Sequence, residues 1–150
     1  MILKSIEDTK KIAQSLANEI INKKVIFLYG KIGVGKTTFV RGLINNLELE
    51  KGVNKSQILS PTFNIVFDYK IKNLKIMHYD LFRLKNSRDV EELGIFDEIK
   101  DHIILIEWPE IIQKKPQSRI EIFFNYFGEN LEKRHIKIRG YGKWSNYEFE

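Results

Sequence analysis

The chain has 150 residues, 43% of them hydrophobic, with a formal net charge of +5 and no cysteine. This length suits one domain with a moderate core, and the lack of cysteine excludes disulfides and thiolate-bound zinc. The positive charge would suit an anionic partner, but its lysines are spread along the chain without a dense run. A lysine-rich surface explains the charge better than a nucleic-acid-binding stretch does.

The first predicted element is a helix over about residues 6–21, with Ser5 as its N-cap and apolar residues recurring on one face. Residues 1–8 include acidic side chains and no long apolar stretch, so they resemble neither a signal peptide nor a membrane span. We therefore expect a cytoplasmic protein without a membrane association. We also expect the isolated chain to be a monomer.

The most specific pattern follows an apolar, β-rich run over residues 25–29. Residues 30–37 read Gly-Lys-Ile-Gly-Val-Gly-Lys-Thr and match the phosphate-binding pattern G-x-x-x-x-G-K-[ST] at every fixed position. Apolar residues at helical spacing follow from Phe39 to Leu47. The loop thus joins a strand to a helix N-terminus, where free N–H groups and the helix dipole bind an anion. This setting favours a nucleotide triphosphate site over a glycine-rich turn without a ligand.

Each fixed position of the loop has a physical task. Gly30, Gly33 and Gly35 allow the backbone to bend so that several N–H groups point at one phosphate. Lys36 then reaches the β- and γ-phosphates, and the hydroxyl of Thr37 ligates magnesium. We therefore expect ATP-type nucleotide and Mg²⁺ as cofactors.

The middle of the chain alternates strand and helix signals. A polar connection covers residues 48–57, and two strands over 63–69 and 74–80 form an antiparallel hairpin. Residues 86–100 follow as a helical stretch broken at Gly94.

The last third returns to the sheet. Residues 102–106 form a short buried strand that ends at Glu107, and Pro109 starts another short helix. Residues 119–127 and 134–139 alternate as two strands around a turn at 128–130. The order of elements predicts an α/β, P-loop NTPase-like fold of three layers, with a mixed, centrally parallel sheet flanked by helices. One domain would span residues 1–150, with a loosely ordered tail from about residue 141.

Two acidic residues at strand ends are candidates for holding magnesium and orienting the attacking water. Glu107 follows four apolar residues, the usual shape of a Walker-B strand, and Asp80 ends another strand. Alternation places His78 on the same face of the strand as Asp80. A histidine–carboxylate pair on the side of the loop is therefore one interpretation. A sheet residue packed under the loop helix explains His78 better than a direct catalytic role does.

Two further segments have open interpretations. Residues 60–62, Ser-Pro-Thr, lie where nucleotide switches place a threonine that senses the γ-phosphate, and a plain turn fits them nearly as well. Trp108 directly follows Glu107, so it lies near the nucleotide and could contact the base or a partner; core packing is the alternative.

Five strings together closely resemble one family. They are GVGKTTFVRGL at 33–43, SPTF at 60–63, HYDLFRL at 78–84, ELGI at 92–95 and IEWPE at 106–110. Their order and spacing are similar to those of the TsaE (YjeE) family, small bacterial ATPases needed for threonylcarbamoyladenosine modification of tRNA. The resemblance runs from about residue 5 to residue 139. Lys31, where the family usually has an acidic residue, and Val34, in place of a usual alanine, depart from the pattern outside its fixed positions.

The resemblance implies roles for the matching positions. Thr37 and Glu107 would ligate magnesium, and Asp80 would support hydrolysis together with Lys36 and Glu107. Thr9 and Arg134 match family positions near the nucleotide. With the position of Trp108, the residues expected to bind ATP are Thr9, Gly33, Val34, Gly35, Lys36, Thr37, Thr38, Trp108 and Arg134.

The implied function is that of a weak Mg²⁺-dependent ATPase that assists a synthase without making the modification itself. It would bind the TsaD and TsaB proteins and use ATP to permit repeated turnover, reaching tRNA indirectly through that complex. A small-molecule kinase is one alternative, which phosphate transfer to an added acceptor would identify. An ATP-dependent binding module without useful hydrolysis is another, which a non-hydrolysable ATP analogue would identify.

Overall fold

The computed structural model describes residues 1–97, 99–128 and 130–149, and a mixed sheet of eight strands runs through them. The strands are β1 (Ile2–Leu3), β2 (Val25–Tyr29), β3 (Val66–Ile71), β4 (Leu74–Asp80), β5 (Ile103–Glu107), β6 (Arg119–Phe127), β7 (Asn130–Tyr141) and β8 (Glu148–Phe149). The α-helices are α1 (Ile6–Ile20), α2 (Lys36–Glu50) and α3 (Ser87–Glu92), and the 3-10 helices are η1 (Ile21–Lys23), η2 (Pro109–Ile111) and η3 (Gly142–Trp144). No helix in these ranges is long and apolar enough to cross a membrane.

The sheet is parallel at its centre and antiparallel at its edges, as predicted. Its order is β1-β7-β6-β2-β5-β4-β3, with β8 paired to β7. β2 runs parallel to both β5 and β6, and β4 runs parallel to β5. The β3–β4 hairpin closes one edge, and the antiparallel β6, β7 and β1 form the other. β2 and β5 are apolar on both faces because both faces are covered, as parallel strands require.

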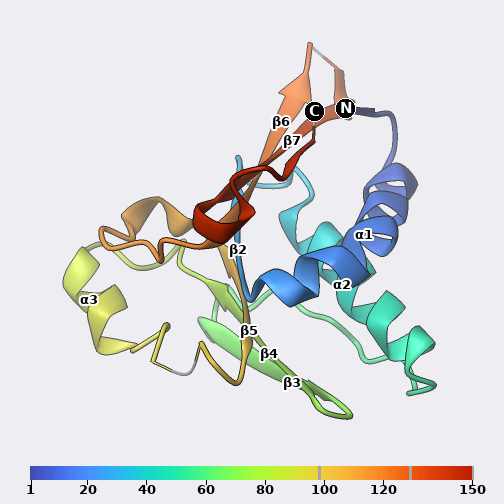
Figure 1. The fold of residues 1–150 in the computed structure, drawn as a ribbon. Helices are drawn as coiled ribbons and strands as arrows, with labels where there is room; N and C mark the ends of the chain where they lie inside the picture. The colour runs from blue at the N-terminus through green and yellow to red at the C-terminus, as the bar shows by residue number, and fades with distance from the viewer. Residues whose placement is uncertain (98, 129, 150) are drawn as a thin grey trace.

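Helices cover the two faces unequally (Figure 1). α1 and α2 pack together on one face, where the larger apolar core joins them to the sheet through residues such as Leu16, Leu43 and Ile122. The opposite face carries a smaller core, in which Val90 of α3 and Ile112 meet β2, β4 and β5. The predicted three-layer α/β, P-loop NTPase-like fold is thus confirmed.

Two element boundaries between the phosphate loop and β4 differ from the prediction. α2 continues through Glu48, which the sequence assigns to a polar connection, because the buried carboxylate of Glu48 accepts hydrogen bonds from the Asn45 side chain and the Ser56 backbone. The predicted strand over 63–69 begins later, at Val66, since the preceding residues form a turn that ends at Ile65 with φ of 68°.

The other differences lie away from the site. The helical stretch predicted over 86–100 keeps its helix only to Glu92, because Gly94 turns the chain with φ of 57°; Glu98 lies outside the described residues. β7 is longer than the strand predicted over 134–139, and Glu129 of the predicted turn also lies outside the described residues. The segment predicted as a loosely ordered tail contains η3 and β8.

Candidate nucleotide-binding site

The carboxyl ends of the parallel strands meet at one cavity of about 210 Å³. β2 leads directly into the phosphate loop (residues 30–37), and the register of β4 with β5 places Asp80 opposite Glu107. Ligands collect at this edge of α/β sheets. The lining residues are Ile32, Gly33, Gly35, Lys36, Thr37, Thr38, Ser60, Thr62, Asp80, Phe82, Glu107 and Trp108.

The phosphate loop has the backbone that its glycines predict. Gly30, Gly33 and Gly35 all have positive φ, at 142°, 74° and 114°. A Cβ on Gly30 would lie 2.5 Å from the carbonyl oxygen of Phe124, so β6 also requires glycine there. α2 begins at Lys36, which directs its free N–H groups toward the cavity edge.

The ammonium group of Lys36 lies against the phosphate loop. Its ammonium nitrogen lies 2.6 Å from the carbonyl oxygen of Gly30 and 3.1 Å from that of Lys31, and 3.9 Å from the ring centre of Trp108. The residue is only 4% exposed. Burial lowers the pKa of the Lys36 ammonium group, and nearby carboxylates oppose that shift. The charge is therefore held by neutral partners that an anionic ligand can replace.

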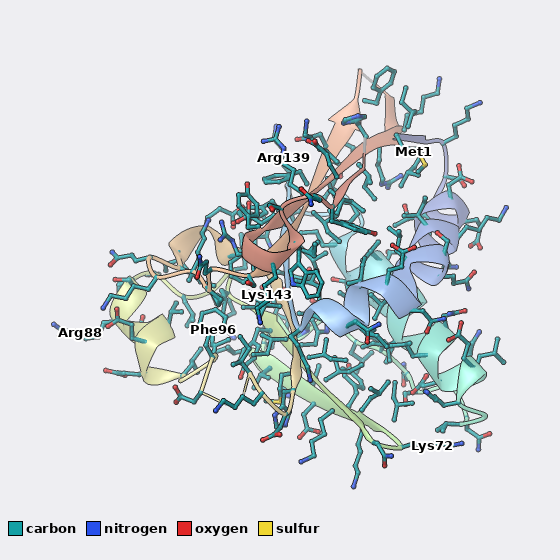
Figure 2. The ribbon with its side chains drawn as sticks, in the orientation of Figure 1. Met1, Lys72, Arg88, Phe96, Arg139 and Lys143 are labelled. Carbon is teal, nitrogen blue, oxygen red and sulfur yellow. The ribbon has the colours of Figure 1, made fainter. Side chains whose placement is uncertain are left out.

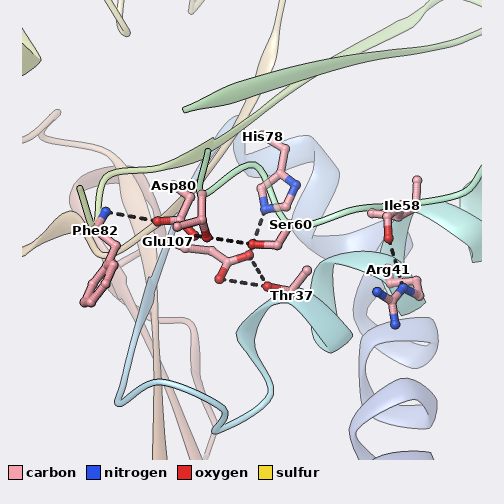
Figure 3. Close-up of polar contacts among 9 residues, drawn as sticks. Thr37, Arg41, Ile58, Ser60, His78, Asp80, Phe82 and Glu107 are labelled. Carbon is pink, nitrogen blue, oxygen red and sulfur yellow. Dashed lines mark hydrogen bonds and ion pairs between the residues drawn. The ribbon is translucent and has the colours of Figure 1, made fainter. Parts of the chain in front are cut away.

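Glu107 joins the loop helix to the sheet. The hydroxyl of Thr37 lies 2.9 Å from Glu107 Oε1 and 3.1 Å from Oε2. His78 Nε2 lies 2.9 Å from the same Oε1, so the histidine–carboxylate pair forms with Glu107 (Figure 3). His78 and Glu107 are buried, at 0% and 3% exposed. The two residues predicted as metal ligands thus lie in direct contact.

Asp80 is held by the segment that the sequence interprets as a switch or a plain turn. Thr62 Oγ1 donates to Asp80 Oδ2 at 2.6 Å, and Ser60 Oγ lies 2.8 Å from Thr62 Oγ1. The backbone N–H of Phe82 donates to Asp80 Oδ1 at 3.0 Å. Residues 60–62 therefore lie against the cavity and connect it to the β3–β4 hairpin.

Thr9 and Arg134 lie beneath the loop instead of lining the cavity. Arg134 Nε donates to the Val34 carbonyl oxygen at 2.8 Å. A Cβ on Gly35 would lie 3.6 Å from Arg134 Nε and 3.8 Å from Thr9 Cγ2, so all three meet at the start of α2. Val34 is buried with them, and Thr9 Oγ1 has no hydrogen-bond partner among the described residues.

Two aromatic residues, one beside the loop and one in the cavity wall, were not predicted as site residues. Tyr126 donates from its hydroxyl to the Ile32 carbonyl oxygen at 3.2 Å, and alternation along β6 from buried Phe124 was the signal for its face. Phe82 lines the cavity, and its ring centre lies 4.8 Å from that of Trp108. Trp108 lines the cavity and contacts Lys36, and it also packs against the smaller apolar core, so the core-packing interpretation holds in part.

Comparison with known proteins identifies the family. The family model described as "Threonylcarbamoyl adenosine biosynthesis protein TsaE" matches residues 3–136. The chain belongs to the TsaE family. As a member of the TsaE family, it is a P-loop-type nucleotide-binding protein.

Individual relatives agree with the TsaE assignment. A "tRNA threonylcarbamoyladenosine biosynthesis protein TsaE" from Rickettsia felis is 42% identical over 113 residues, which are 75% of this chain and 64% of that protein. The chain thus matches slightly less than two thirds of that relative's length. The protein of the same name from Aquifex aeolicus is 36% identical over 144 residues. The alignment covers 95% of this chain and 96% of that protein.

One solved structure has a similar fold. The crystal structure of YdiB from Bacillus subtilis superposes with a TM-score of 0.70 at 26% identity, covering 95% of this chain and 85% of that one. The sheet and the phosphate loop described above are therefore those of an established fold.

Proposed function

We propose that this chain is a single-domain, ATP-binding and ATP-hydrolysing accessory subunit for threonylcarbamoyladenosine modification of tRNA. It acts in the cytoplasm on the TsaD and TsaB proteins and reaches tRNA through them. The observation that carries the hydrolytic part is the contact of Thr37 with Glu107 beside Asp80, at the end of the loop that holds Lys36. The family assignment carries the biological part.

The oxygen atoms at this edge fit Mg²⁺. Magnesium prefers one or two carboxylates together with phosphate oxygens over an all-protein cage. Thr37 and Glu107 supply such a partial set, and no group of three or more histidine, aspartate or glutamate ligands occurs within the described residues. When bound, the ion supplies charge neutralisation at the β- and γ-phosphate oxygens.

The chain's own residues divide the remaining work. Lys36 exchanges its two loop carbonyls for phosphate oxygens, which are stronger partners for an ammonium group because they are charged. Glu107 and the Thr37 hydroxyl would bind Mg²⁺. Asp80, fixed by Thr62, accepts a hydrogen bond from the attacking water and orients it.

Apart from Lys36, no cationic side chain lines the cavity among the described residues. None of the residues lining the cavity in the described part of the chain is an arginine. Arg41 donates to the Ile58 carbonyl oxygen at 3.1 Å, and Arg83 donates to that of Phe63 at 3.4 Å. Hydrolysis by the isolated chain is therefore slow, because an arginine finger supplies much of the rate in this class of reaction.

Reconstituted tRNA modification tests the proposal. TsaD and TsaB are incubated with tRNA and their threonylcarbamoyl donor, and modified adenosine is counted per TsaD over time. Adding this chain with ATP is expected to convert limited turnover into repeated turnover, and Lys36→Ala is expected to abolish the gain. Repeated turnover with a non-hydrolysable ATP analogue would indicate a binding module. Turnover that ignores the chain altogether would refute the function.

A further inference from the structure

His78 has an unusual place for a polar ring. It lies on β4 with no exposed surface, and its Nε2 lies 2.9 Å from Glu107 Oε1 on the neighbouring strand. Its other ring nitrogen, Nδ1, is buried without a hydrogen-bond partner in residues 1–97, 99–128 and 130–149. A carboxylate only accepts hydrogen bonds, so Nε2 carries the hydrogen of this contact.

Packing alone does not account for the imidazole. On the same face of β4 the two nearest residues are Ile76 and Asp80, and the register partner of His78 on β5 is Leu105. Ile76 and Leu105 are buried and apolar, and the Asp80 carboxylate is held by Thr62 and Phe82. An aliphatic side chain there would fill the space without burying a ring nitrogen that has no hydrogen-bond partner, which is unfavourable. The bond to Glu107 is the compensation that this structure provides.

The hydrogen bond from His78 restrains the orientation of the Glu107 carboxylate. A glutamate at a strand end rotates about three side-chain bonds, and in this structure both Thr37 and His78 restrain it (Figure 3). As a metal ligand, Thr37 would turn an oxygen lone pair toward the ion and still donate its single hydrogen to Glu107, so its restraint is tied to the position of the loop. The His78 restraint comes from the opposite strand and is independent of the loop.

We infer that His78 is a positioning residue that holds Glu107 in the orientation needed to bind magnesium together with the nucleotide. This inference rests on the proposed function, in which Glu107 is a magnesium ligand. Partners that orient metal ligands in this way typically change metal affinity or activity by about 10- to 100-fold when they are removed. His78 itself touches neither the nucleotide nor the ion.

A matched pair of variants separates positioning from packing. In His78→Gln the amide nitrogen occupies the position of Nε2, the same number of bonds from Cβ, whereas in His78→Asn it occupies that of Nδ1 and falls short of Glu107. We expect His78→Asn to raise the Mg²⁺ concentration that half-saturates the ADP complex by about 10- to 100-fold. We expect His78→Gln to restore most of that loss. Calorimetric ADP titrations at a series of Mg²⁺ concentrations measure both.

ADP affinity in excess chelator and thermal unfolding check that each variant is folded. Equal behaviour of the two folded variants, whether both retain or both lose the Mg²⁺ dependence, would overturn the inference. Glu107→Gln in the same titration distinguishes failure of this inference from failure of the proposed function. If Glu107→Gln leaves the Mg²⁺ dependence unchanged, the assignment of Glu107 as a metal ligand fails.

Nuclear magnetic resonance provides a readout that needs no His78 variant. The His78 ring is expected to show a slowly exchanging hydrogen on Nε2, whose resonance shifts in Glu107→Gln while those of His102 and His135 do not. A His78 ring with its hydrogen on Nδ1 would overturn the inference without any measurement of ATP hydrolysis.

Discussion

Lys36 is a buried cation whose direct contacts are with uncharged groups, while carboxylates lie farther away. Two loop carbonyls and the face of Trp108 hold it, and its pKa is lowered by burial. A charge kept in such surroundings gains more from a phosphate than a solvated lysine does, because the local dielectric is low.

Replacing Lys36 with alanine should weaken ATP binding by about 10- to 100-fold, as the loss of a hydrogen bond to a charged group predicts, and abolish hydrolysis. Lys31→Ala is the matched control: it removes an exposed lysine from the same loop but keeps the Lys31 carbonyl that accepts from Lys36. Calorimetry and steady-state phosphate release measure the two effects. Near-normal ATPase activity in a folded Lys36→Ala protein would contradict the phosphate-loop assignment.

The two carboxylates should affect hydrolysis more than affinity. Asp80→Asn and Glu107→Gln keep the size of each side chain but remove its charge beside the cavity. We expect the rate of hydrolysis to fall by about 100-fold or more, the usual contribution of a positioned catalytic group, and ADP affinity in chelator to change far less. A collapse of ADP affinity with normal residual turnover would assign these residues to nucleotide binding instead.

At the scale of elements, the β6–β7 pair supports the phosphate loop from below. Arg134 on β7 and Tyr126 on β6 donate to the Val34 and Ile32 carbonyl oxygens, at 2.8 and 3.2 Å. These strands are distant in the chain from the loop, yet their side chains hold its backbone.

Removal of the Arg134 contact should loosen the loop. Arg134→Met leaves the Val34 carbonyl without this donor, and we expect a loss of about 1–3 kcal/mol in the free energy of unfolding together with weaker ADP binding. Tyr126→Phe removes a more exposed bond and should cost less in both. Chemical denaturation and calorimetry measure them. If Arg134→Met loses stability but binds ADP normally, the contact supports the fold and not the site.

At the scale of the whole molecule, apolar side chains gather beside the cavity. Phe63 is 82% exposed and follows Thr62, while Ile32 and Phe82 line the cavity at 72% and 51% exposed. Exposed large apolar residues grouped around a site mark an interaction surface. They support the proposal that this chain binds TsaD and TsaB.

Substitution of Phe63 tests that surface. Phe63→Ser should weaken capture of TsaD and TsaB in an ATP-dependent pull-down, because the apolar side chain can no longer be buried on binding. Leu49→Ser is the control, since Leu49 is similarly exposed, at 68%, near the end of α2. Equal capture by both variants would exclude Phe63 from the contact.

Partner binding should also raise the rate of hydrolysis. The chain alone is expected to release phosphate slowly, since no cavity-lining residue in its described part is an arginine, and TsaD with TsaB should accelerate it by ordering residues 60–62 or by adding a charge. Steady-state assays with each protein alone and with both together measure this. Fast turnover by the chain alone, unchanged by the partners, would contradict the coupling.

The sequence by itself determined the phosphate loop and the acidic residues that end β4 and β5. The signals are local: glycines at 30, 33 and 35, an apolar run before them and helical spacing after them. The structure has the expected strand, positive φ angles and helix. Asp80 and Glu107 were identifiable because each ends an apolar strand.

Only the tertiary structure decided which of these residues meet. Local patterns do not fix strand order, and it is the pairing of β4 with β5 that sets Asp80 opposite Glu107 and brings His78 to that carboxylate. Arg134 reaches the phosphate loop across 100 residues of chain, since β6 and β7 continue the sheet beside β2. Hydrogen bonds between distant segments depend on how the sheet is assembled, and short-range propensity carries no record of that order.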